Sequence, residues 1–362
     1  MKRSLIQGLS EKDMQAVVNT YNLNAYYWPT LLPLKFTPVL TWKVLQGTLG
    51  VPVAADVISY NARAPRKTRN VVSRLQGDIP KISVGRDKEE TDLNELNQLQ
   101  QYAKTTEGAS ALLDWIYEDV EFCFNAVNAR LEWLALRALS TGKIVLDSSN
   151  NEGVVTETAV DFQVPEDQKS GVAVAWTEAN AESFKPITIL KERVKSAKKK
   201  GFALKYALMN QDTFDRMVTS KQLINACAGW VIQATGIDTL TPSLEVVNRV
   251  FASQKLPEIR IIESLVTIEI NGKQTVVEPW EDGVVTLLPE LMVGSTYYAP
   301  LADEMVTDSV ATKVKRGHVL IKKYSEEEPL KECTVAMANA FPAWGNSQRS
   351  FLIDTLHTSW SK

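Results

Sequence analysis

The most regular hydrophobic pattern in the chain lies between Ser110 and Ser140. Apolar side chains recur there at steps of three and four residues, which is the spacing of one helix face: Leu113, Ile116, Tyr117, Val120, Phe124, Val127, Leu131, Leu134 and Ala138. The pattern predicts a helix of roughly 45 Å at 1.5 Å per residue, which is unusually long and needs a sheet or groove for support. Gly142 is well placed as the residue just past its end.

The first 50 residues mix short apolar runs with prolines, which disfavour helix. Only residues 10–21 are expected to form a helix, with Ser10 as its cap. The rest is predicted to be an extended arm rich in Trp, Tyr and Leu. Because such an arm would not stay solvated alone, we expect it to lie on its own body or on another subunit.

Residues 51–86 are predicted to form a two-stranded excursion with a turn-like tip at 62–67. The tip and the strand after it carry five basic residues and no acidic one, namely Arg63, Arg66, Lys67, Arg69 and Arg74. The sign of the charge reverses over residues 87–95, where Asp92 is expected to begin a helix with Glu95 as its capping-box partner. We expect Gly108 to interrupt or bend that helix. The two charged runs are either solvated surfaces, or the basic loop rests on an acidic patch of a neighbouring subunit.

Short strands and helices follow the long helix. Strands are predicted at 143–146, 154–164, 172–176, 202–209, 258–262, 284–288, 319–324, 333–338 and 350–355. A hairpin is expected over 265–277 around Asn271-Gly272, and helices at 187–199, 211–219 and 243–254. A loop containing Pro342 is expected before the last strand. Residues 184–310 are expected to form an α/β domain, and the sequence has no internal repeat.

The composition is that of an ordinary soluble globular protein, with 44% hydrophobic and 23% charged residues. A net charge of -3 argues against a general nucleic-acid binder. The cysteines Cys123, Cys227 and Cys333 are far apart and odd in number, so we expect them to be buried and reduced. No signal peptide and no membrane span are expected.

Candidate catalytic chemistry is sparse. The chain has two histidines, His318 and His357, and both are expected at the surface. No nucleophile, phosphate-loop or metal motif is present. Asp212 and Asp215 would share a helix face and are expected to be solvated, and the three lysines at 198–200 suit a helix C-terminus. Trp28 and Trp42 are expected in a core or interface, not in a ligand platform. The sequence therefore predicts neither an enzyme nor a cofactor.

Four segments together resemble the lambda-type (protein E) family of tailed-phage major capsid proteins. The first runs from Ala129-Arg130-Leu131-Glu132 to Ala138-Leu139-Ser140-Thr141-Gly142-Lys143-Ile144 and resembles the end of the family's long helix. The second is residues 160–165 (VDFQVP), followed by Trp176 and Pro186-Ile187. The third is residues 281–285 (EDGVV), followed by Pro289, Gly294 and Tyr297-Tyr298, and the fourth is Phe341-Pro342 before a final strand. Tyr298-Ala299 stands where the family pattern has Tyr-Gly, a departure that affects the expected local turn and not the resemblance as a whole.

The resemblance implies a Hong Kong 97-like capsid fold, and it alone implies the α+β class for the whole chain. It would have an N-terminal arm (1–50), an extended loop (51–86), a peripheral domain with the spine helix (87–183, completed by 311–362) and an axial domain (184–310). The protein would assemble into pentamers and hexamers of an icosahedral phage head, in the host cytoplasm, around double-stranded DNA that it does not read by sequence. Scaffolding, portal and decoration proteins are the other expected partners. The expected contacts between subunits are Arg63, Arg66, Lys67, Arg69, Arg74 and Trp28. An encapsulin-type shell protein is the alternative, and a soluble α/β enzyme is a remote one.

Overall fold

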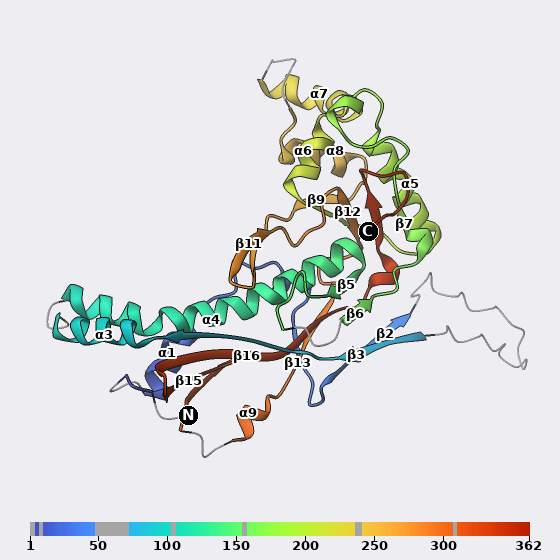
Figure 1. The fold of residues 1–362 in the computed structure, drawn as a ribbon. Helices are drawn as coiled ribbons and strands as arrows, with labels where there is room; N and C mark the ends of the chain where they lie inside the picture. The colour runs from blue at the N-terminus through green and yellow to red at the C-terminus, as the bar shows by residue number, and fades with distance from the viewer. Residues whose placement is uncertain are drawn as a thin grey trace, which may run out of the picture. The chain divides into compact units, whose positions relative to one another are not determined.

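A computed structural model describes residues 4–6, 10–47, 72–102, 106–153, 158–235, 241–306 and 310–362 (Figure 1). The chain forms two compact units. Unit 1 comprises Met1–Trp42, Gly77–Leu134 and Ser295–Ala343, and unit 2 comprises Lys43–Gln76, Ala135–Gly294 and Trp344–Lys362. The mixture of helices with largely antiparallel sheets confirms the predicted α+β class.

Unit 1 is built on a six-stranded sheet in the order β1-β13-β16-β15-β14, with β4 also pairing with β16. Its strands are β1 (Leu34–Phe36), β4 (Lys81–Lys88), β13 (Gly294–Ala299), β14 (Thr312–Arg316), β15 (Val319–Glu327) and β16 (Leu330–Trp344). Strand β16 pairs antiparallel with β4 over residues 332–339 and with β15 over residues 330–337. The first part of α4 (Thr106–Thr141) runs along this sheet (Figure 1).

Helix α4 is the long helix that the periodicity predicted. It has 36 residues, which corresponds to about 54 Å at 1.5 Å per residue. Gly142 follows it with a φ of 79°, as expected for the residue past a helix end. Gly108 lies inside α4, so it does not interrupt the helix, and the expected bend stays a prediction.

The remaining helices of unit 1 are α1 (Glu11–Thr20), α2 (Trp28–Leu31), α3 (Glu90–Tyr102) and α9 (Ala302–Met305). Ser10 caps α1 as predicted, because its hydroxyl accepts from the Asp13 amide at 3.2 Å. Helix α3 begins two residues before the predicted start. Asp92 instead reaches back to the Glu89 amide at 2.9 Å, which is the third-position role in a capping box.

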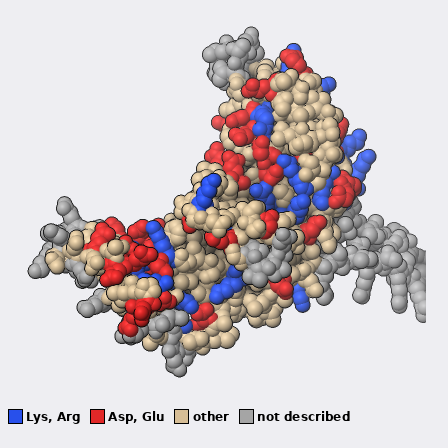
Figure 2. Space-filling model, viewed as in Figure 1, with Lys and Arg blue, Asp and Glu red and all other residues tan. Residues whose placement is uncertain are grey.

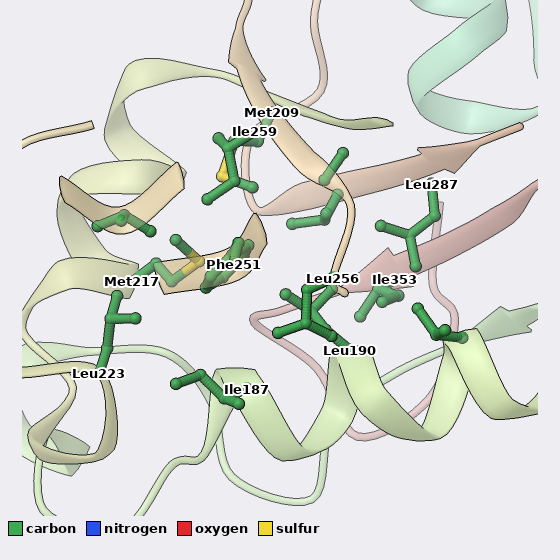
Figure 3. Packing of buried hydrophobic residues seen from close by; sticks show 14 of the residues in the cluster. Ile187, Leu190, Met209, Met217, Leu223, Phe251, Leu256, Ile259, Leu287 and Ile353 are labelled. Carbon is green, nitrogen blue, oxygen red and sulfur yellow. The ribbon is translucent and has the colours of Figure 1, made fainter. Parts of the chain in front are cut away.

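Unit 2 contains a five-stranded sheet in the order β7-β17-β12-β8-β9. Its strands are β7 (Lys169–Ser170), β8 (Tyr206–Met209), β9 (Glu258–Ile261), β12 (Val284–Leu288) and β17 (Phe351–Asp354). Helices α5 (Pro186–Lys199), α6 (Gln211–Val218), α7 (Lys221–Thr235) and α8 (Leu244–Ser253) supply apolar side chains to the same core. Figure 3 shows this packing, with Leu190, Phe251, Leu287 and Ile353 converging from two helices and two strands.

Three strand pairs complete the described fold. Hairpin β10 (Val266–Ile270) with β11 (Lys273–Val277) confirms the predicted Asn271-Gly272 turn, and both turn residues have positive φ. Strands β5 (Lys143–Leu146) and β6 (Thr158–Asp161) pair antiparallel. Strands β2 (Thr41–Gly47) and β3 (Val72–Asp78) pair with each other. Strand β2 lies in the segment expected to be an extended arm, and β3 lies in the predicted excursion, whose tip is outside the described residues.

The two units divide the chain differently from the expected domains. Strand β17, expected to return to the peripheral domain, pairs with β12 and β7 and therefore belongs to unit 2. Residues 143–183 also belong to unit 2, and residues 295–310 to unit 1. Pro342, expected in a loop, lies in β16 beyond the residues that pair with β4 and β15. Residues 172–176 form no strand, although Val172 and Trp176 donate to the His357 and Thr355 carbonyls.

Candidate functional site

The N-terminal arm is anchored on its own unit by one buried carboxylate. Glu132 of α4 is fully buried. Its two oxygens accept the backbone amides of Tyr27 at 3.1 Å and Trp28 at 2.8 Å, at the start of α2. These bonds satisfy amides that a helix start leaves without intrahelical partners. In the family-like segment Arg130-Leu131-Glu132, Glu132 is therefore the residue that holds the start of α2 in place.

Trp28 is part of this anchored core. Its side chain has no exposed surface and meets the ring of His318 edge-on, with 5.4 Å between ring centroids. The expectation that Trp28 contacts a neighbouring subunit is thus corrected, because its ring is already enclosed within unit 1. His318, expected at the surface, is also buried. Burial lowers its pKa to about 4, since a charged imidazolium would lose its hydration there.

Trp42 fills a second core position, as the sequence suggested. Its ring stacks on Phe341 with centroids 5.6 Å apart, and it has no exposed surface. A Cβ placed on Gly77 would lie 2.9 Å from the same ring, so only glycine allows this close approach. No face of Trp42 is left for a ligand.

Beyond these anchors the arm presents apolar side chains to solvent. Strand β1 lies at the edge of the unit 1 sheet and pairs in parallel with β13. Phe36, Val39 and Leu40 are each more than half exposed, and Leu34 is 38% exposed. We call these four residues the arm apolar surface. Neighbouring exposed apolar side chains beside an open strand edge are typical of contact surfaces.

The basic residues proposed from the sequence are not placed by the structure. Arg63, Arg66, Lys67 and Arg69 lie outside the described residues. The backbone of Arg74 belongs to β3, and its side chain is not among those described. Their role in subunit contact therefore stays a prediction.

The structure describes an acidic surface in unit 1. Acidic side chains gather over α3 and the first half of α4 in unit 1 (Figure 2), and the exposed ones are Glu89, Glu90, Glu95, Asp114, Glu118 and Glu121. We call these six residues the acidic helix surface. Arg86 of β4 reaches Glu118 at 3.3 Å and lies 4.8 Å from the Phe122 ring.

A buried ionic group lies under this surface. Lys323 and Glu332 are fully buried, and Asp119 and Lys88 nearly so. Lys88 lies directly opposite Glu332 in the strand register and approaches Asp119 at 3.2 Å. Lys323 donates to the Ile116 carbonyl at 3.1 Å. Burial lowers the pKa of Lys323 and raises that of Glu332, although each opposes the shift of the other.

The last residues of the chain bring together an acid, an imidazole and a hydroxyl. His357 Nδ1 lies 2.9 Å from Asp354 Oδ2 and 3.2 Å from Ser361 Oγ. A catalytic triad needs the acid and the nucleophile on opposite ring nitrogens. Here Asp354 and Ser361 both contact the same ring nitrogen, so the arrangement is not that of a catalytic triad. It ties the C-terminal residues together by hydrogen bonds. Asp212 and Asp215 are exposed, as expected for solvated side chains.

The cysteines and the lysine run lie where the sequence analysis expected them. Cys123, Cys227 and Cys333 are buried free thiols, and burial raises the pKa of each. Lys198 and Lys199 occupy the last turn of α5. Among the described residues, no group of three or more His, Cys, Asp or Glu side chains could hold a metal ion. Within the same residues, no helix is long and apolar enough to cross a membrane.

Most of the chain matches the model of a known protein family. The family model described as phage major capsid protein E matches residues 54–347. The chain belongs to the phage major capsid protein E family. The resemblance read from the four sequence segments is thereby confirmed, and the protein is a major capsid protein, a structural component of the virion.

Solved structures show the same fold for this capsid protein. A crystal structure of the putative capsid protein of a prophage from E. coli CFT073 has a TM-score of 0.59 and 14% identity, covering 96% of this chain and 99% of that one. A phage-related protein from Bordetella bronchiseptica RB50 has a TM-score of 0.54 and 12% identity, with 98% of each chain covered. The expected capsid fold is thus confirmed. No curated protein matches the chain at a significant level.

The encapsulin alternative receives no comparable support. The SrpI encapsulin from Synechococcus elongatus PCC 7942 has a TM-score of 0.39 and 10% identity, with 98% of each chain covered. A likeness at that level is too weak to separate one shell protein from another.

Proposed function

We propose that this capsid protein assembles in the host cytoplasm into pentamers and hexamers of an icosahedral shell around double-stranded DNA. The observation that carries the proposal is the arm apolar surface. Leu34, Phe36, Val39 and Leu40 remain exposed in the single chain although the arm itself is anchored through Glu132. Burying such a surface in a neighbour supplies a hydrophobic driving force for association.

Electrostatics supplies the second part of the proposal. The basic residues Arg63, Arg66, Lys67, Arg69 and Arg74 of one subunit pair with the acidic helix surface of its neighbour. Complementary charges of this kind mainly set register and partner choice, and they weaken as salt rises. Residues 51–86 then act as the extended loop of the capsid fold, residues 1–50 as its arm, and the remaining segments as the peripheral and axial domains.

The shell has no catalytic role, needs no cofactor and contacts its DNA without sequence readout. Scaffolding, portal and decoration proteins complete the head. The net charge of -3 supports a lining that does not bind DNA tightly.

The hydrophobic part is tested with Phe36→Asp and the matched control Phe36→Leu. The aspartate variant should lose most of the rapidly sedimenting material in a sucrose gradient while its circular dichroism stays native. The leucine variant should sediment as the parent protein does. Shell yield that is equal in all three proteins would contradict the role of the arm apolar surface.

The charge pairing is tested by reversal and rescue. Arg66→Glu with Lys67→Glu should reduce assembly, and adding Glu90→Lys with Glu95→Lys in the same chain should restore part of it. Restoration is expected because the swapped charges again attract across the contact. Full assembly of the first double variant would refute the pairing. If that variant assembles poorly and the added lysines do not restore assembly, the acidic partner of the basic residues is not Glu90 and Glu95.

A further inference from the structure

A short stretch of the N-terminus packs against α3, α4 and β16. The residues that it contacts are called the groove: Leu93, Leu96, Trp115, Ile116 and Glu332. Ile6 is 5% exposed and packs with Leu93 and Leu96 of α3 and with Trp115 and Ile116 of α4. These residues form a satellite core under the acidic helix surface. The groove therefore holds an aliphatic side chain donated by a segment that is distant in sequence.

The polar side of the groove is Glu332 of β16. One of its oxygens accepts the Leu5 amide at 2.9 Å, and the other accepts the Ser4 hydroxyl. Ser4 Oγ also accepts the Ile6 amide at 3.2 Å, which holds the three residues in a compact turn. Residues 4–6 thus donate two hydrogen bonds to the Glu332 carboxylate and pack the Ile6 side chain among apolar residues of α3 and α4.

The Glu332 carboxylate also lies near charged side chains of the sheet and of α4. It is fully buried, and Lys88 faces it across the strand pair. Lys323, also fully buried, lies on the neighbouring strand β15 opposite Thr334, two residues along the register from Glu332. Asp119 completes the ionic group. A buried carboxylate aimed at donors from elsewhere in the chain has the chemistry of a receptor for backbone and hydroxyl donors.

We propose that this groove is a peptide-binding site that residues 4–6 occupy as a separable ligand. Its ligand is a short peptide with a hydroxyl residue, then a free backbone N–H, then an aliphatic residue. The dissociation constant of the free peptide is on the order of 0.1 mM, as suits so few contacts.

The test uses the full-length chain with its own segment displaced. Ile6→Asp places a charge in the apolar pocket and vacates the groove. A fluorescent peptide of residues 1–9 is then titrated and its anisotropy measured. The peptide should bind the Ile6→Asp chain saturably. It should bind the parent chain about tenfold or more weakly, because the parent's own tethered segment competes at a millimolar effective concentration. A peptide carrying the same Ile6→Asp change should not bind.

Two further variants test where the peptide binds and provide a second way of displacing the segment. Leu96→Ala in the vacated chain should weaken the peptide by about tenfold through loss of pocket contact. Leu5→Pro removes the donor to Glu332 and vacates the groove by a second route if Ile6→Asp fails to fold. Equal binding to the parent and vacated chains, or no binding to either folded vacated chain at millimolar peptide, would overturn the proposal. These measurements use unassembled protein, so they are independent of shell formation.

Discussion

The anchoring of the arm by Glu132 leads to a quantitative prediction. Glu132→Gln keeps the size of the side chain but replaces one acceptor oxygen by an amide group that faces a backbone N–H. One of the two bonds at 3.1 Å and 2.8 Å is lost and the other becomes neutral. Hydrogen bonds to charged groups contribute about 1.5–3 kcal/mol each, so the arm should be destabilised by about 2–4 kcal/mol.

Amide hydrogen exchange measures this loss at the two donors themselves. Peptides covering residues 24–32 should exchange about 30-fold faster or more in Glu132→Gln, because each 1.4 kcal/mol is a factor of ten in the opening equilibrium. Glu121→Gln is the matched control, since Glu121 is on the same helix but exposed. If exchange at residues 24–32 is equal in the two variants, Glu132 does not anchor the arm.

Three further predictions concern the buried groups. The pKa of His318 is lowered from 6.5 to about 4, so between these pH values the unfolded chain binds more protons than the folded one. Roughly 3 kcal/mol of stability is therefore lost as pH falls from 6.5 to 4. Urea titrations at several pH values should show that His318→Phe lacks this pH-dependent loss of unfolding free energy. Gly171→Ala should cost about 1–3 kcal/mol and expose the C-terminal segment to protease, because its Cβ would lie 2.3 Å from the His357 carbonyl oxygen. Gly85→Ala should be nearly neutral, because its Cβ would lie 3.4 Å from a Val335 methyl group, which is an ordinary contact distance. The three buried cysteines should resist a thiol reagent in the native protein and react fully in guanidinium; prompt native labelling would contradict their burial.

Elements with a strong local signal were predictable from the sequence. The three-four spacing of α4, the Asn271-Gly272 turn and the Ser10 cap each depend on residues that are near one another in the chain. Their physical causes are helix periodicity, the positive φ of a tight hairpin turn and the satisfaction of first-turn amides. For that reason the structure reproduces them within one or two residues, apart from the longer N-terminal part of α4.

Features that depend on distant partners were missed. Helix α7 and strands β1, β13 and β14 were not predicted, and the membership of β17 in the second sheet follows from pairing with β12, which no local pattern records. The ionic group was also missed, because no local pattern shows which charged side chains from α4, β4, β15 and β16 are buried together. A signal did exist in β15, where alternation places Lys323 on the same face as the buried Ile321.

The central claim is that this chain builds a closed shell through the surfaces of its arm and loop. Cryo-electron microscopy of the purified full-length protein tests it most directly. We predict closed icosahedral particles with pentamers and hexamers, in which residues 34–40 are buried against an adjacent subunit and residues 63–74 lie over its acidic helix surface. Discrete monomers or dimers under all assembly conditions, or shells in which Phe36, Val39 and Leu40 remain exposed to solvent, would contradict the account.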